Sequence, residues 1–202
     1  MSHEKDAKTE TAIHPLLSAR WSPYAYSDRP VADDDLRALL EAARWAPSSY
    51  NEQPWRYIVA RRGDGAAFDK LLSCLVEGNQ AWASNAPVLL IGIAVMSFSR
   101  NGKPNKAAHH DLGLAAGNIC VEATARGLHV HQMIGIVPEK VRDLYAVPDN
   151  AEPLTAVAVG YLGDGRGLAD ALRERDRALR TRNPLASLVF EEKWGNAARL
   201  GG

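Results

Sequence analysis

Three segments of the sequence are rich in arginine, in small polar side chains or in both. In the first, Arg20-Trp21-Ser22, the arginine and the serine are two residues apart and share one side of an extended segment. A guanidinium and a hydroxyl both donate hydrogen bonds that suit a phosphate. A surface arginine and a turn serine before Pro23 give the same pattern more often, so this segment alone does not define a site.

A second segment, near the end of the chain, is rich in arginine. Its arginines are Arg173, Arg175, Arg177, Arg180 and Arg182. The first three alternate with Glu174 and Asp176, which indicates a solvated, charged helix face. The last two follow where the helix is expected to end, where a cation complements the helix dipole. No carboxylate neighbours them, so a solvated face explains them less well.

The third segment, residues 46–55, places short donors and acceptors between two prolines. Pro47 and Pro54 stiffen the segment, and Ser48, Ser49 and Asn51 lie between them. An ordered turn or a polar planar ligand can use these groups, and the residues alone favour the turn.

Neither a metal site nor a common nucleotide-binding motif is expected. The central histidines are His109, His110, His129 and His131, and the last two point to one face of an expected strand. No HExxH motif or carboxylate cluster accompanies them. The sequence also lacks the GxGxxG and P-loop patterns.

Hydrophobic periodicity predicts the elements that position these groups. The expected helices are 32–43, 66–77, 107–126, 139–145 and 168–179, and the expected strands are 55–61, 88–95, 129–136 and 154–162. Asp33 is the expected N-cap of the first helix. The apolar run 88–95 fits a strand buried on both faces. Gly113 and Gly117 share one face of the long helix, which indicates close packing against another backbone. This mixture predicts an α/β or α+β fold with a central sheet.

The length of 202 residues suits one domain. We expect residues 1–12 to form a mobile tail and residues 13–202 to form a single domain. The apolar but aperiodic stretch 181–202 is expected to pack on a partner subunit. Cys74 and Cys120 are far apart in the sequence and are expected to be reduced, partly buried thiols.

The charge balance and the length of the apolar runs limit which kinds of partner the protein is expected to have. The formal net charge is zero, so broad binding to nucleic acids or anionic membranes is not expected. The first residues lack the apolar core of a secretory signal. The longest apolar run, Pro87–Met96, is too short to span a bilayer. We therefore expect a soluble, cytoplasmic protein.

Taken together, these segments resemble the nitroreductase family of flavoproteins. The most specific match is the loop Pro47-Ser48-Ser49-Tyr50-Asn51-Glu52-Gln53-Pro54-Trp55, which resembles the family signature Pro-Ser-Ser-x-Asn-x-Gln-Pro-Trp at every fixed position. Residues 20–26 resemble Arg-x-Ser-x-Arg/Lys-x-Phe/Tyr, and residues 180–185 resemble Lys/Arg-x-Arg-x-Pro-Leu. Residues 79–87 and 127–135 resemble the stretch before the second core strand and the strand that passes the flavin. The matches follow the family order over nearly the whole chain.

The resemblance implies an α+β fold: an FMN-binding α/β sandwich with a central, mostly antiparallel sheet flanked by helices, built as an intertwined homodimer. The implied cofactor-binding residues are Arg20, Trp21, Ser22, Tyr24, Pro47, Ser48, Ser49, Asn51, Asn79, Met133, Ile134, Gly135, Arg180 and Arg182. By resemblance, the arginines and Ser22 hold the phosphate and ribityl chain, and residues 48–51 come from the opposite subunit. Asn79 meets the pyrimidine edge, and the backbone at Ile134 and Gly135 lies near flavin N5. Tyr50 and Trp82 are candidate substrate contacts.

The implied activity is ping-pong hydride transfer from NAD(P)H through FMN to a nitroaromatic, a quinone or a related small-molecule acceptor. The flavin rather than a side chain carries the chemistry. Tyr24 and Trp82 stand where family members have arginine or lysine, which leaves the flavin potential and the acceptor open. Reductive dehalogenation, ring dehydrogenation and flavin binding without turnover remain alternatives. RNA binding through residues 173–182 is disfavoured because aromatic residues are not interleaved there.

Overall fold

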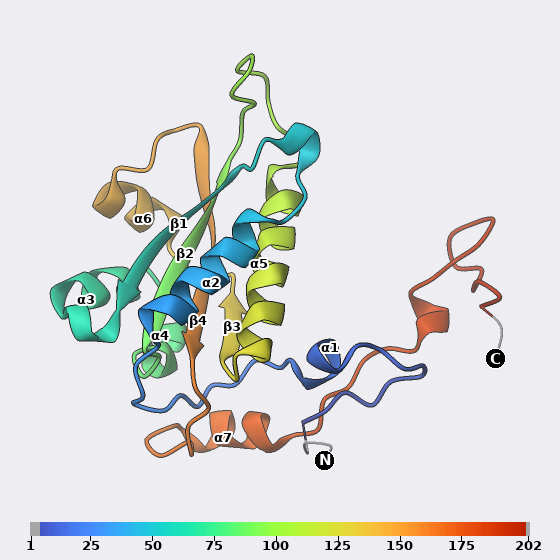
Figure 1. Cartoon of the computed structure of the whole chain (residues 1–202), viewed down its shortest axis with the longest axis horizontal. Coiled ribbons are helices and arrows are strands. Elements are labelled where there is room, and N and C mark those ends of the chain that lie inside the picture. The colour runs from blue at the N-terminus through green and yellow to red at the C-terminus, as the bar shows by residue number, and fades with distance from the viewer. Residues whose placement is uncertain (1–4, 201–202) are drawn as a thin grey trace.

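Four strands form the centre of the computed structural model, which describes residues 5–200. They are β1 (Trp55–Arg61), β2 (Val88–Val95), β3 (His129–Met133) and β4 (Ala151–Gly160). All pair in an antiparallel manner, in the order β1-β2-β4-β3 (Figure 1). Successive residues of β2 point to opposite faces, and both sets are buried. The prediction of a strand buried on both faces is therefore confirmed.

Helices cover both faces of this sheet. They are α1 (Pro15–Ala19), α2 (Asp33–Arg44), α3 (Ala66–Leu72), α4 (Glu77–Ala83), α5 (Ala108–Ala125), α6 (Pro138–Tyr145) and α7 (Asp170–Arg177). The core on one face joins α2 and α5 to Leu90 and Val157 of the sheet. The core on the other face joins α3, α4 and α6 to Leu89 and Ile91. The expected α+β sandwich is confirmed. No helix within residues 5–200 has the length and apolar composition needed to cross a bilayer.

Several predicted boundaries differ from the observed ones. The helix expected over 66–77 ends at Leu72, and a second helix begins only at Glu77; between them Val76 donates its backbone N–H to the carbonyl of Gly135 at 3.1 Å. The strand expected over 129–136 ends at Met133, because the N–H of Ile136 turns back to the carbonyl of Ile134 at 2.7 Å. This break and this turn bring the start of α4 next to the end of β3.

The start of α2 also differs from the prediction. Its N-cap is Ala32, which makes no side-chain capping bond, and Asp33 is the first helical residue. The Asp33 carboxylate instead accepts a hydrogen bond from Arg61 at 2.7 Å. Asp33, Asp34 and Asp35 still place negative charge at the positive end of the helix dipole.

The glycine face of α5 is open. Gly113 and Gly117 are exposed, and a Cβ added at either position would meet no described atom within 4 Å. The close backbone packing expected there is not made within residues 5–200 of one chain. Another molecule can approach this face closely.

One carboxylate joins the two ends of the chain. Asp176, on α7, accepts hydrogen bonds from the backbone N–H of Tyr24 at 2.9 Å and of Ala25 at 2.9 Å. Arg180, just after α7, donates to the carbonyl of Ser18 at 2.6 Å and to the carbonyl of Lys5 at 2.8 Å. The segment that begins at Lys5 and the segment that follows α7 therefore run together.

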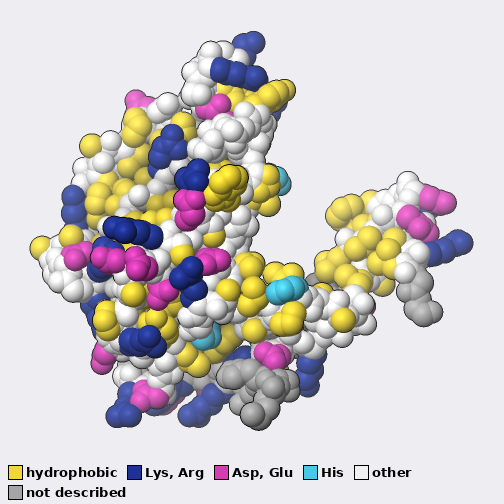
Figure 2. Space-filling view, in the orientation of Figure 1, with side chains coloured by type: hydrophobic (Ala, Val, Ile, Leu, Met, Phe, Trp, Pro, Cys, Tyr) yellow, Lys and Arg dark blue, Asp and Glu magenta, His cyan; other side chains and the backbone are white. Residues whose placement is uncertain are grey.

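The terminal segments concern two expectations: a mobile tail at residues 1–12, and packing of residues 181–202 on a partner subunit. Residues 1–4 of the expected tail lie outside the described residues; the described part is anchored at Lys5, which is buried and donates to the carbonyl of Ala178. The last segment projects from the body as an arm (Figure 1). Apolar side chains cover much of this arm (Figure 2), and Trp194 is 90% exposed. The tail's mobility and the arm's packing on a partner stay predictions.

Replacing Asp176 with alanine should lower the free energy of unfolding by about 2–4 kcal/mol, because two backbone N–H groups lose their acceptor. Urea denaturation followed by circular dichroism measures this loss. Glu174→Ala is the matched control, since it removes an exposed carboxylate from the same helix and should change stability by less than about 0.5 kcal/mol. Equal effects of the two substitutions would contradict the structural role of Asp176.

Candidate functional site

Three arginines from the two ends of the chain line one cavity of about 360 Å³. Arg20 follows α1, whereas Arg180 and Arg182 follow α7. Arg20 donates a hydrogen bond to the hydroxyl of Ser22 at 3.2 Å, so the two side chains share one side, as their spacing predicts. The Asp176 carboxylate holds the backbone beside this group and keeps both ends in place.

The positive charge of this cavity is poorly compensated. Within residues 5–200, no salt bridge joins Arg20, Arg180 or Arg182 to a carboxylate. Burial, together with the charges of Arg20 and Arg182, lowers the pKa of Arg180, and Asp6 opposes the shift. Among the carboxylates of residues 5–200, Glu10 alone lines the cavity, and it accepts a hydrogen bond from a backbone N–H. The arrangement suits an anion with more than one negative charge.

The loop 47–53 is an ordered turn with its own hydrogen bonds. The hydroxyl of Ser48 accepts from the backbone N–H of Gln53 at 3.0 Å, and the N–H of Ser49 donates to Asp111 of α5 at 3.0 Å. The amide of Gln53 donates to the carbonyl and to the side-chain oxygen of Asn51. The exposed Pro47 precedes these bonds. The turn favoured by the residues alone is therefore present.

This loop lies away from the arginine cavity within one chain. It is tied to the first turn of α5 by Asp111. Burial raises the pKa of the Cys120 thiol, opposed by a hydrogen bond from Gln132 and by the nearby charge of Arg20. Arg20 thus lies near a position nine residues further along α5, about 13 Å of helix axis. The structure does not bring the loop and the arginines together in one chain, and Figure 1 shows them toward opposite ends of α5.

Asn79 and the turn after β3 do come together. The side-chain amide of Asn79 donates to the carbonyl of Gly135 at 3.0 Å. A Cβ at position 135 would lie 2.5 Å from the Asn79 amide nitrogen, so only glycine fits without displacement. Ile134 is 71% exposed on this turn, whereas the side chain of Met133 is buried. The backbone of the turn, rather than Met133, is therefore the part that can face a ligand.

Trp82 corrects an expectation. Its indole is only 1% exposed and packs edge-on against Tyr24, with ring centroids 5.1 Å apart. Its centroid is also 4.5 Å from that of His131. Because Tyr24 and His131, from two other segments, pack against the buried indole, we do not assign Trp82 a substrate contact.

Sequence reasoning missed two partners of Tyr24. Arg175 donates to the Tyr24 hydroxyl at 3.5 Å, so a cation stands beside the tyrosine that replaces the expected one. The ring of His131 packs 4.7 Å from that of Tyr24, and its Nδ1 lies 2.9 Å from the carbonyl of Pro23. Burial lowers the pKa of His131, which favours the neutral ring. In the sequence, only the position of His131 on an expected strand could have indicated its contact with Tyr24.

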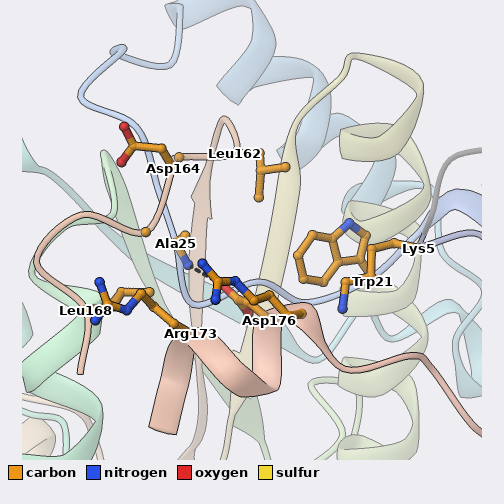
Figure 3. Close-up of a pocket in the computed structure, with 11 residues that line it drawn as sticks. Lys5, Trp21, Ala25, Leu162, Asp164, Leu168, Arg173 and Asp176 are labelled. Carbon is orange, nitrogen blue, oxygen red and sulfur yellow. Dashed lines mark hydrogen bonds between the residues drawn. The ribbon is translucent and has the colours of Figure 1, made fainter. Parts of the chain in front are cut away.

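A separate cavity of about 200 Å³ lies beside Trp21 (Figure 3). Lys5 stands over the indole of Trp21, 4.9 Å from its centroid, and Asp176 lies at the same cavity with both oxygens committed to backbone N–H groups. None of Arg20, Arg180 and Arg182 lines this cavity. The side chain of Trp21 thus faces a different space from the arginines, and the role of Trp21 in cofactor binding stays a prediction.

The described histidines, cysteines and carboxylates do not gather into a metal site. Within residues 5–200, no group of three or more such side chains is positioned to hold a metal ion. His129 packs edge-on against Trp21, with ring centroids 5.7 Å apart.

The chain belongs to the nitroreductase family. The model of that family matches residues 17–161. A solved structure described as an oxidoreductase containing FMN is 34% identical, with 97% of this chain and 100% of that chain covered and a TM-score of 0.89. A protein from Desulfovibrio desulfuricans solved in complex with FMN is 26% identical, with 91% and 99% covered and a TM-score of 0.69. A relative from Archaeoglobus fulgidus, provisionally named NADH dehydrogenase/NAD(P)H nitroreductase, is 29% identical over 89% of this chain and 97% of its own length.

Proposed function

We propose that this chain is an FMN-dependent oxidoreductase that takes electrons from NAD(P)H and works as a homodimer. The observation that carries the proposal is the cluster of Arg20, Arg180 and Arg182, which line one cavity and form no salt bridge with any carboxylate of residues 5–200. Membership of the nitroreductase family and the FMN in related structures support it.

The arginine cavity fits the phosphate end of FMN. Burial and then the charges of Arg20 and Arg182 lower the pKa of Arg180, and a phosphate near charge −2 would offset both effects. Guanidinium groups supply fixed, paired donors for phosphate oxygens, and each charge-assisted hydrogen bond contributes about 1.5–3 kcal/mol. Ser22, already within hydrogen-bonding distance of Arg20, adds a neutral donor beside them.

The turn after β3 and Asn79 are assigned to the ring. The Asn79 amide nitrogen is engaged by Gly135, which leaves its side-chain oxygen to accept from the polar edge of the ring. Backbone N–H groups at Ile134 and Gly135 are assigned to the edge that exchanges hydride. FMN, when bound, supplies the two-electron chemistry. The residues position it, and Arg175 brings positive charge to Tyr24.

Three features support the proposed dimer. The loop 48–51 is far from the arginines of its own chain, the glycine face of α5 is open, and the arm exposes apolar side chains. A second copy would bring its loop to the arginine cavity and cover the other two surfaces. An obligate interface of this kind buries more than about 2,000 Å².

The proposed acceptors are nitroaromatics, quinones or related small molecules. The segment between β2 and α5 is a short hairpin, in which Ser97 pairs with Pro104. It is too small for the large substrate-covering lid that a dedicated dehalogenase or ring dehydrogenase requires. This observation favours an open site with broad acceptor use.

Replacing both Arg20 and Arg182 with alanine should weaken FMN binding at least about a hundredfold, because two charge-assisted contacts are lost. Absorbance of the purified protein and equilibrium dialysis with FMN measure the change. Arg37→Ala removes an exposed guanidinium outside the cavity and should leave the flavin in place. Undiminished flavin binding by the double variant would contradict the assignment of the cavity.

Anaerobic addition of NADH or NADPH should bleach the oxidised flavin spectrum of the wild-type protein, because the proposed donor reduces the bound flavin. Stopped-flow absorbance gives the rate for each donor. An oxidised spectrum that persists with both donors would reject the reductase activity while leaving flavin binding intact.

Light scattering should give twice the chain mass of 22.0 kDa for the flavin-loaded protein. Removing residues 186–202 should weaken the dimer, because the exposed apolar side chains of the arm lose their contact area. A flavin-loaded monomer of the full chain would overturn the shared-site arrangement.

A further inference from the structure

The hairpin between β2 and α5 is an ordered structure that contacts the loop 47–53. Phe98 donates its backbone N–H to the carbonyl of Lys103 at 2.8 Å, and Gly102 donates to the carbonyl of Phe98 at 2.8 Å. The carboxylate of Glu52 accepts from the backbone N–H of Ser99 at 2.6 Å and so ties the hairpin to the loop. The two segments therefore hold a fixed relation to each other.

Three side chains meet where these segments touch. The rings of Tyr50 and Phe98 are nearly perpendicular, at 86°, with centroids 5.8 Å apart. The guanidinium carbon of Arg100 lies 4.1 Å from the centroid of Tyr50 and 5.2 Å from that of Phe98. We call Tyr50, Phe98 and Arg100 the aromatic platform.

Tyr50 is held in an unfavourable conformation although its ring remains outside the core. Its φ of 54° lies in the left-handed region, which a non-glycine residue with a bulky side chain rarely adopts. Its side chain is nonetheless 74% exposed. Burial of the ring therefore contributes little free energy to offset this backbone strain. Strained residues of this kind concentrate at ligand-binding sites.

The guanidinium donors of Arg100 are not used by the part of the chain that the structure describes. Within residues 5–200 its guanidinium donates no hydrogen bond and forms no salt bridge. The neighbouring carboxylate of Glu52 is engaged by the backbone of Ser99. That bond, together with the positive charges of Arg100 and Arg56, lowers the pKa of the Glu52 carboxyl. The planar donors of Arg100 are thus available to an anion beside the Tyr50 ring.

We propose that the aromatic platform binds a substrate's planar ring on Tyr50 and an anionic group of the same substrate on Arg100. The proposal rests on the proposed function, because it assigns the platform to recognition of the electron donor or acceptor. Two substrate sources carry this chemistry: the phosphorylated adenosine end of NAD(P)H, and an aromatic acid that accepts electrons. Phe98 supports the Tyr50 ring from its edge.

Calorimetric titration of the purified flavin-loaded protein tests the platform without turnover. The probes are 2′,5′-ADP for the donor and 4-nitrobenzoate for the acceptor, with adenosine and 4-nitrobenzamide as their uncharged counterparts. Arg100→Gln should weaken an anionic probe about tenfold and leave its uncharged counterpart unchanged. Tyr50→Asn keeps a residue that tolerates positive φ and should weaken both members of the pair.

Lys103→Gln is the matched control, because it removes one positive charge from the same hairpin outside the platform and should not change binding. The probe whose affinity depends on Arg100 identifies the source: 2′,5′-ADP the donor, 4-nitrobenzoate the acceptor. The proposal is overturned if neither anionic probe binds the wild-type protein, or if Arg100→Gln affects charged and uncharged probes equally. Failure of flavin reduction by NAD(P)H, by contrast, would reject the proposed function and leave these binding results standing.

Discussion

The carboxylate of Asp176 accepts hydrogen bonds from the backbone of residues 24 and 25 and thereby fixes where the two ends of the chain meet. Three guanidinium groups gather beside this junction, although like charges repel. This repulsion raises the free energy of the folded junction, and a bound anion would lower it again. A ligand that binds only the assembled junction also stabilises the fold. In the proposed function, anchoring of the terminal segments and retention of the cofactor's phosphate are in this way linked.

The sheet and its covering helices were predictable because their signals are local. The run 88–95 is apolar at every position but one, and only a strand buried on both faces requires that. The pairing of Arg20 with Ser22 follows from their spacing alone. The loop 47–55 was recognisable because its residue order is specific, and its internal hydrogen bonds agree with the turn that the residues favour.

What the sequence did not indicate depends on contacts between distant segments. Asp176 alternates with arginines and has the pattern of a solvated face, yet its partners lie about 150 positions earlier in the chain. Trp82 is buried by Tyr24 and His131, which belong to separate segments, so its exposure could not be read from its neighbours in sequence. Gly135 is required because the Asn79 amide occupies the space of a side chain. The break between α3 and α4 follows from the same contact region, and periodicity does not detect it.

The separation of the signature loop from the arginines along α5 has a genetic consequence. In the proposed dimer, each complete site draws its guanidinium groups from one copy and its loop from the other. Consider a mixed dimer in which one copy lacks the arginines and the other lacks the loop. One of its two sites then has both the arginines and the loop, and the other site has neither. If the proposed dimer forms by random pairing, half of the dimers are mixed and each keeps one of its two sites, so two inactive alleles expressed in the same cell would together recover about a quarter of the normal capacity, whereas neither allele would recover any alone.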